Sequence, residues 1–214
     1  MKRYFSERLI VYLLGVIIMS FGVALSVEAN IGVAPGSTVS YATSKLTPLS
    51  VGWCTSLFNV FWVLLQLAVT RRFELKLLLQ FPLAYVFGRL IDFYLSIFRL
   101  YIPNPVFNYL YLIAGLLIFS LGIRLIVGAD ILLVPPDAFA RAVGNVFGWP
   151  MSKSKLVFDV VVTAVSALLM LVFSGDVFSV VGPGTVICAA GTGPAIGLYT
   201  KLLPLRRLAK PGNR

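Results

Sequence analysis

The sequence predicts an all-α integral membrane protein with six transmembrane helices, arranged as two inverted three-helix repeats that each carry an extra short half-helix. Composition gives the first indication, because 59% of the 214 residues are hydrophobic and only 12% are charged. Soluble domains average about 45–50% apolar and 25% charged residues, so an apolar surplus of this size calls for lipid as the solvent. The second indication is an internal repeat, since the chain aligns with itself at a shift of 100 residues.

The repeat contains nine identities within 21 ungapped positions, from Gly15 aligned with Gly115 to Pro35 aligned with Pro135. Three further polar pairs align: Asn30 with Asp130, Ser37 with Asp137, and Asn59 with Asp159. Internal repeats of this length within a membrane are typical of transporter folds. We therefore divide the chain into a first membrane repeat, residues 1–104, and a second, residues 105–214, which ends in a basic cytoplasmic tail.

Six apolar runs approach the ~20 residues that a helix needs to cross the hydrocarbon core. They lie near 9–28, 53–70, 76–98, 108–128, 155–174 and 183–203. With a cytoplasmic N-terminus, 14 of the 18 basic residues fall on the cytoplasmic side and two fall outside. This bias predicts that both termini face the cytoplasm. Three spans per repeat is an odd number, so the second repeat is expected to enter the membrane from the opposite side.

Each first span is followed by a segment that is too short to cross and too apolar for an ordinary loop, namely 30–47 and 130–148. Pro35 and Pro135 break the preceding helix, and Ser37 and Asp137 then stand where a helix N-cap belongs. The segments either re-enter the bilayer as half-helices or lie flat at its surfaces. If they re-enter, Gly/Pro-interrupted segments of this kind mark the binding site of a transporter. We therefore predict substrate binding at these segments, with these candidate residues: Ser37, Asp137, Asn30 and Asp130.

Charged residues within the spans are a second set of candidates, because an Asp or Arg at the bilayer centre costs about 2.5–3.5 kcal/mol. Arg89 and Asp92 lie on one face of the third span, and Asp159 lies in the cytoplasmic third of the fifth. Arg89 and Asp92 either form a structural pair or bind substrate, with Arg89 holding a carboxylate or phosphate. Asp92 and Asp159 are the candidate proton carriers.

The last span is rich in small residues, and it aligns with the third span after the register slips by five, so that Gly88 aligns with Gly193. Gly193 and Gly197 allow close helix contact, either within the monomer or across a homodimer. With no histidine in the chain and no GxSxG, HExxH or GxxxxGK[ST] motif, we expect no catalytic residue, no metal site and no cofactor. Nucleic-acid binding is not expected, because the basic residues are spread between apolar segments.

The segments Phe21–Leu25, Ala29–Pro35 and Gly88–Phe93 resemble those of the YczE/YyaS/YitT-like bacterial integral membrane proteins. Val134-Pro-Pro-Asp137 matches the proline–acid element of that family, whereas Ser37 stands where its first repeat often has an aspartate. The resemblance implies a small multi-pass protein of the bacterial inner membrane, with export of small molecules among its suggested roles.

Together these features predict a secondary transporter or exporter of an unidentified small molecule, with its site between the two inverted repeats. The alternative is a non-transporting scaffold or accessory subunit of another membrane protein. Neither interpretation makes the protein an enzyme. Its expected partners are the lipid bilayer, a small-molecule substrate and a second copy of the chain.

Overall fold

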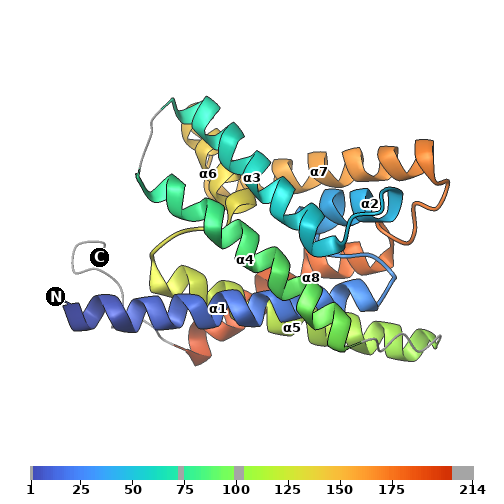
Figure 1. The fold of residues 1–214 in the computed structure, drawn as a ribbon, viewed down its shortest axis with the longest axis horizontal. Helices are drawn as coiled ribbons and strands as arrows, with labels where there is room; N and C mark the ends of the chain where they lie inside the picture. Colours follow the sequence, from blue (N-terminus) through green and yellow to red (C-terminus); the bar gives the residue numbers. More distant parts are fainter. Residues whose placement is uncertain (1, 72–74, 99–103, 204–214) are drawn as a thin grey trace.

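All regular secondary structure in the described part of the chain is helical (Figure 1). The computed structural model describes residues 2–71, 75–98 and 104–203, so the predicted basic tail at 204–214 lies outside the described residues. The elements are α1 (Lys2–Glu28), the 3₁₀ turn η1 (Pro35–Ser37), α2 (Thr38–Leu46), α3 (Val51–Thr70), α4 (Leu75–Ile97), α5 (Pro105–Ala129), α6 (Pro135–Phe147), α7 (Met151–Phe173) and α8 (Pro183–Leu202). The all-helical prediction is confirmed.

Five of the described helices are long and apolar enough to cross a membrane. These stretches are Ser6–Glu28, Val51–Thr70, Leu77–Ile97, Pro105–Ala129 and Met151–Phe173. They coincide with the first five predicted spans, apart from shifts of a few residues at their ends. Helix α8 covers the sixth predicted span, but its glycine, threonine and proline residues make it less apolar than the other five. The five apolar helices indicate a membrane protein.

Short helices form at both interrupted segments, and the chain enters each of them in the same way. Asn30 and Asp130 both adopt the left-handed conformation, with φ of 50° and 48°, within two residues of the ends of the long helices α1 and α5. Asparagine and aspartate reach this conformation more easily than other residues with a side chain. A short irregular stretch then leads to the proline that begins the next element, Pro35 in η1 and Pro135 in α6.

The expected N-caps are not formed by the predicted side chains. Ser37 is the residue before α2, but its hydroxyl makes no capping hydrogen bond. Helix α6 begins at Pro135 instead of after Asp137, because a proline is well tolerated in the first turn of a helix. Asp137 therefore lies inside the first turn of α6, where its carboxylate is free to bind another side chain.

Helices α1 and α5 form the centre of the molecule and cross through glycines. A Cβ added at Gly22 would lie 2.8 Å from the Gly115 oxygen, and one added at Gly15 would lie 3.1 Å from the Gly122 oxygen. Since the lower number on α1 faces the higher number on α5, the two helices are antiparallel. Helix α4 packs beside α1 and α8 packs beside α5, while α2, α3, α6 and α7 form a second layer (Figure 1).

The two halves differ in how their last two helices meet. Helix α3 packs along α4, and a Cβ added at Gly52 would overlap the carbonyl oxygen of Gly88. Helix α7 packs on α2, α6 and η1, but it has no comparable interface with α8. Gly193, which aligns with Gly88, has no atom within 4 Å of where its Cβ would be. One end of the molecule is therefore closed, whereas α7 and α8 are apart.

Candidate functional site

A cavity of about 580 Å³ lies between the two layers. Residues of α1, α4, α5 and α8 line it from one layer, and residues of η1, α2, α3, α6 and α7 line it from the other. Ser152 and Leu156 of α7 and Gly193 of α8 line the cavity and are also exposed, so the cavity reaches the surface between these helices. Its volume falls in the range of about 300–1,000 Å³ that is usual for small-molecule sites.

An ion cluster stands at the α6–α7 end of the cavity. Lys155 Nζ lies 2.8 Å from Asp137 Oδ1 and 2.8 Å from Asp159 Oδ1. Asp159 is one turn along α7 from Lys155, whereas Asp137 comes from the first turn of α6. Gly36 lies beside the cluster, since a Cβ there would be 3.5 Å from Lys155 Nζ. One ammonium group therefore joins both helices and bridges two carboxylates.

The residues that align with this cluster in the first half also line the cavity. They are Ser37, Thr55 and Asn59, which align with Asp137, Lys155 and Asp159. All three are uncharged, and Thr55 and Asn59 are buried. The two halves thus contribute matching positions to one cavity, but only the second half contributes charge.

Aromatic rings make up much of the remaining wall. Phe58, Trp62, Phe87 and Phe119 line the cavity. The Trp62 ring is stacked on Phe139, with 5.5 Å between ring centroids, and meets Phe158 edge-on at 5.0 Å. These contacts hold the indole in place, so the wall offers fixed aromatic surface to a ligand.

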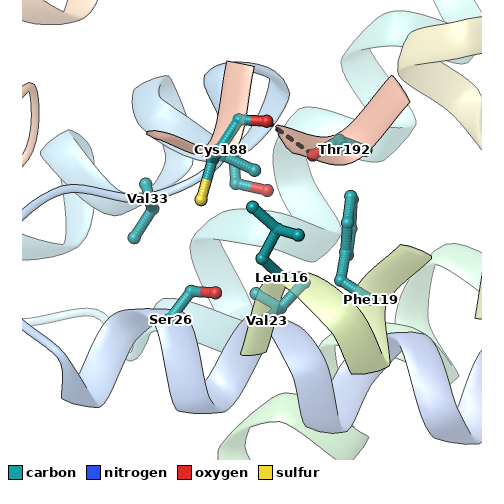
Figure 2. Close-up of a pocket in the computed structure, with 9 residues that line it drawn as sticks. Val23, Ser26, Val33, Leu116, Phe119, Cys188 and Thr192 are labelled. Carbon is teal, nitrogen blue, oxygen red and sulfur yellow. Dashed lines mark hydrogen bonds between the residues drawn. The ribbon is translucent and has the colours of Figure 1, made fainter. Parts of the chain in front are cut away.

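A small pocket of about 10 Å³ adjoins the cavity where α1, α5 and α8 meet (Figure 2). Leu116, Phe119 and Cys188 line it, and the Thr192 hydroxyl donates a hydrogen bond to the Cys188 carbonyl at 2.6 Å. This volume is about that of a single water-sized probe. The small pocket is therefore too small for a ligand larger than a water molecule.

The structure brings three of the predicted site residues together, namely Ser37, Asp137 and Asp159, all of which line the cavity. Arg89 and Asp92 do not line it. They pair at 3.3 Å, as their helical spacing predicts, and Asp92 also accepts hydrogen bonds from the Ser50 hydroxyl at 2.7 Å and the Gly52 amide at 2.8 Å. Asp92 thus binds the N-terminus of α3, where a carboxylate is favoured by the helix dipole.

Asp130 also lies away from the cavity. The Arg8 guanidinium donates hydrogen bonds to the carbonyl oxygens of Ala129 and Asp130, and it pairs with the Asp130 carboxylate at 3.3 Å. These carbonyls belong to the C-terminal end of α5, where a cation is favoured. Arg8 therefore stabilises this helix end, and the Asp130 carboxylate helps to hold Arg8 there.

Asn30 lies in a separate pocket of about 430 Å³, beside Glu28. Its side-chain oxygen accepts hydrogen bonds from the Tyr41 hydroxyl and the Lys45 ammonium, both at 3.2 Å. Burial raises the pKa of the Tyr41 phenol, and the Glu28 and Asp176 carboxylates raise it further. Tyr41 is therefore a stable hydrogen-bond donor that holds the turn between α1 and η1.

Sequence reasoning missed Lys155, Thr55 and the aromatic wall. Lys155 counted only as one of the cytoplasmic loop charges, although it stands four residues before Asp159 and thus on the same helix face. Thr55 aligns with it at the repeat shift of 100 residues. The aromatic residues gave no signal, because most of the predicted spans contain several of them.

The comparisons with known proteins agree with the resemblance noted in the sequence. The chain is 22% identical over 202 residues to a Bacillus subtilis (strain 168) protein named "Uncharacterized protein YyaS", covering 93% of this chain and 95% of that protein. No solved structure matches the chain. The model of a family of unknown function, DUF6198, matches residues 6–201. The predicted YyaS-like relationship is confirmed, and the chain belongs to the DUF6198 family.

Proposed function

We propose that this protein is a secondary transporter of a small molecule, that it spans the bacterial inner membrane six times, and that it binds its substrate in the 580 Å³ cavity. The observation that carries the proposal is that aligned residues of both halves line this single cavity. Transporter sites typically lie at the interface of two repeats near the bilayer midplane. The protein acts by moving its substrate, without catalysis.

The α1–α5 crossing supports an inverted relationship between the halves. The pair Gly15–Gly122 becomes the pair Gly115–Gly22 when each residue is replaced by its repeat mate, and both pairs are in close contact. Such an exchange is what a two-fold axis between antiparallel helices produces. Because α1 and α5 cross the membrane in opposite directions, the axis lies in the membrane plane, as it does in inverted repeats.

The difference between the two helix pairs supports alternating access. If the termini are cytoplasmic, the N-terminal end of α7 faces the cytoplasm, and the cavity opens there between α7 and α8. The seam between Gly52 and Gly88 then closes the opposite, outer end. The pseudo-symmetric state would close α7 on α8 and open α3 from α4. In this scheme Asp137, Lys155 and Asp159 bind the substrate or a coupling proton, and Asp92 holds the outer seam closed.

Access to the cavity from the two sides of the membrane tests this proposal without knowledge of the substrate. We would place a single cysteine at Ser37 in a chain whose native cysteines, Cys54 and Cys188, are replaced by alanine. A membrane-impermeant maleimide is applied to right-side-out and to inside-out vesicles. A transporter that changes state exposes the cysteine to both sides in turn, so both preparations are labelled.

The matched control is Ser20→Cys, because Ser20 is fully buried and lines neither the large cavity nor the small pocket. It should resist labelling from both sides. Labelling of the Ser37 position from one side only would overturn the proposal and favour the scaffold or accessory-subunit function. A homodimer through α8 stays a prediction, for which open space beside Gly197 leaves room.

A further inference from the structure

We infer that the cavity selects amphipathic organic cations of single charge, a substrate class that rests on the proposed function of this site. The charge balance of the lining carries the inference. Among the described residues that line the cavity, the ionisable acids and bases are Asp137, Lys155 and Asp159, apart from the Cys188 thiol. Two carboxylates and one ammonium give a net charge of −1.

The geometry of the cluster shows why Lys155 cannot neutralise both carboxylates. Lys155 Nζ is shared, at 2.8 Å from one oxygen of each aspartate, so neither carboxylate has a cation of its own. The first half compensates nothing, because Ser37, Thr55 and Asn59 are uncharged. An unbalanced charge inside a membrane protein is costly, and one bound cation or one proton removes the imbalance.

The rest of the lining fits the body of an organic cation better than a bare metal ion. Phe58, Trp62, Phe87 and Phe119 supply aromatic surface, and the faces of such rings attract cations. Trp62 is fixed by Phe139 and Phe158, so its face needs little rearrangement on binding. The 580 Å³ volume accommodates a ligand with a substantial apolar body.

The same charge balance makes a proton a competitor of the cation. The groups that face the two carboxylates are Lys155 of α7, at 2.8 Å from each, and the backbone of η1 at Gly36. In the described lining, α1, α2, α3, α4 and α5 present no titratable side chain to the cavity, and α8 presents only Cys188. Cation affinity should therefore fall as the pH is lowered, because protonation of one carboxylate removes the surplus charge.

Two probes of the same shape and opposite charge test the inference on the purified full-length protein. We would measure thermal unfolding with tetraphenylphosphonium, a cation, and with tetraphenylborate, its anionic counterpart. A ligand that binds the native state stabilises it by RT ln(1 + [L]/Kd), so the melting temperature rises with the logarithm of the ligand concentration once this exceeds Kd. We expect the cation to raise it, less so at acidic pH, and the anion to leave it unchanged. Stabilisation by the anion, or by neither probe, would overturn the inference.

Variants then locate the binding. Asp137→Asn and Asp159→Asn each remove the surplus charge and should weaken binding of tetraphenylphosphonium at least tenfold. Asp176→Asn is the matched control, since Asp176 is exposed between α7 and α8, does not line the cavity and should leave this affinity unchanged. If one cavity variant fails to fold, the other variant and the comparison of the two probes on the native chain still test whether the cavity binds cations. Unchanged affinity in a folded cavity variant would contradict the inference.

The two proposals fail in different ways. Two-sided labelling at position 37 without cation binding would leave a transporter for another class of substrate. Cation binding with labelling from one side only would leave a cation-binding protein that does not transport. The two readouts are independent, because labelling needs no ligand and unfolding needs no membrane.

Discussion

Lys155 links two helices and two carboxylates through a single ammonium group. Its partners come from separate parts of the chain, Asp137 from α6 and Asp159 from its own helix. All three side chains are partly buried, with exposed fractions of 33% for Lys155, 20% for Asp137 and 22% for Asp159. Removing a carboxylate leaves a balanced pair, whereas removing the lysine leaves two like charges facing each other. The same three charged groups therefore affect both properties: the lysine is needed for stability, whereas the second carboxylate is needed for the proposed cation binding.

Replacing Lys155 by methionine should lower the free energy of unfolding by about 1–3 kcal/mol, because two partly buried carboxylates lose their shared partner. The deficit should shrink as the pH falls, since protonation of one carboxylate removes the repulsion. Thermal unfolding at two pH values measures both effects. Lys153→Met is the control, because Lys153 is exposed and contacts only the Trp149 ring, at 4.5 Å, among the interactions described for it. An equal loss in both variants would contradict the assigned role of Lys155.

At the scale of elements, glycines decide how closely the central helices approach. Gly22 and Gly122 each lie against the backbone of the opposite helix, at Phe119 and Met19. Small residues at such crossings allow the backbone contact and dispersion that hold membrane helices together, because lipid provides no hydrophobic force between them. The α1–α5 pairing therefore depends on the absence of a side chain at these positions.

Gly22→Ala should destabilise the protein by about 1–3 kcal/mol, because its Cβ would overlap the Phe119 backbone and force the two helices apart. Gly197→Ala adds the same methyl group where no atom lies within 4 Å. It should be neutral or stabilise by up to about 1 kcal/mol, since alanine is the better helix former. Chemical denaturation in detergent compares the two. Equal stability of the variants would show that the crossing tolerates a larger separation.

The sequence could predict the helices and the interrupted segments, because both depend on local features. Apolar length defines the spans, and Pro35 and Pro135 begin the elements that follow the interruptions. The site could be predicted only in part. Charge inside a span marked Asp92 as well as Asp159, but only tertiary packing determines that Asp92 binds the end of α3 while Asp159 faces a cavity.

At the scale of the whole molecule, the two halves have similar elements in unequal arrangements. The seam between Gly52 and Gly88 is closed, while the aligned residues Ser152 and Gly193 both border the cavity. Under the proposed alternating access, each half would adopt the packing that the other half has in this structure, so that one interface opens as its counterpart closes. Such an exchange would need little net free energy, because a similar contact forms as one is lost.

Cysteines at Ser152 and Gly193, in the chain without native cysteines, should form a disulfide when α7 closes on α8. The seam at Gly52 and Gly88 indicates that the closed helices come within the ~4 Å between Cβ atoms that a disulfide needs. The measurement is the loss of maleimide-reactive thiols after mild oxidation. Lys153→Cys with Gly193→Cys is the control pair, because Lys153 does not line the cavity. No excess of cross-linking over this control would contradict the exchange.

The antiparallel contact between α1 and α5 also has a consequence for biosynthesis. The glycine face of α1 is covered by α5, which begins at Pro105, after the whole first half has been translated. At about 5–20 residues per second, this face stays open for several seconds after α1 leaves the ribosome. Helix α4, which also packs beside α1, is made before α5, but the contacts described for Gly15 and Gly22 are with α5. Until α5 is inserted, the insertion machinery or the lipid must therefore cover the glycine face of α1.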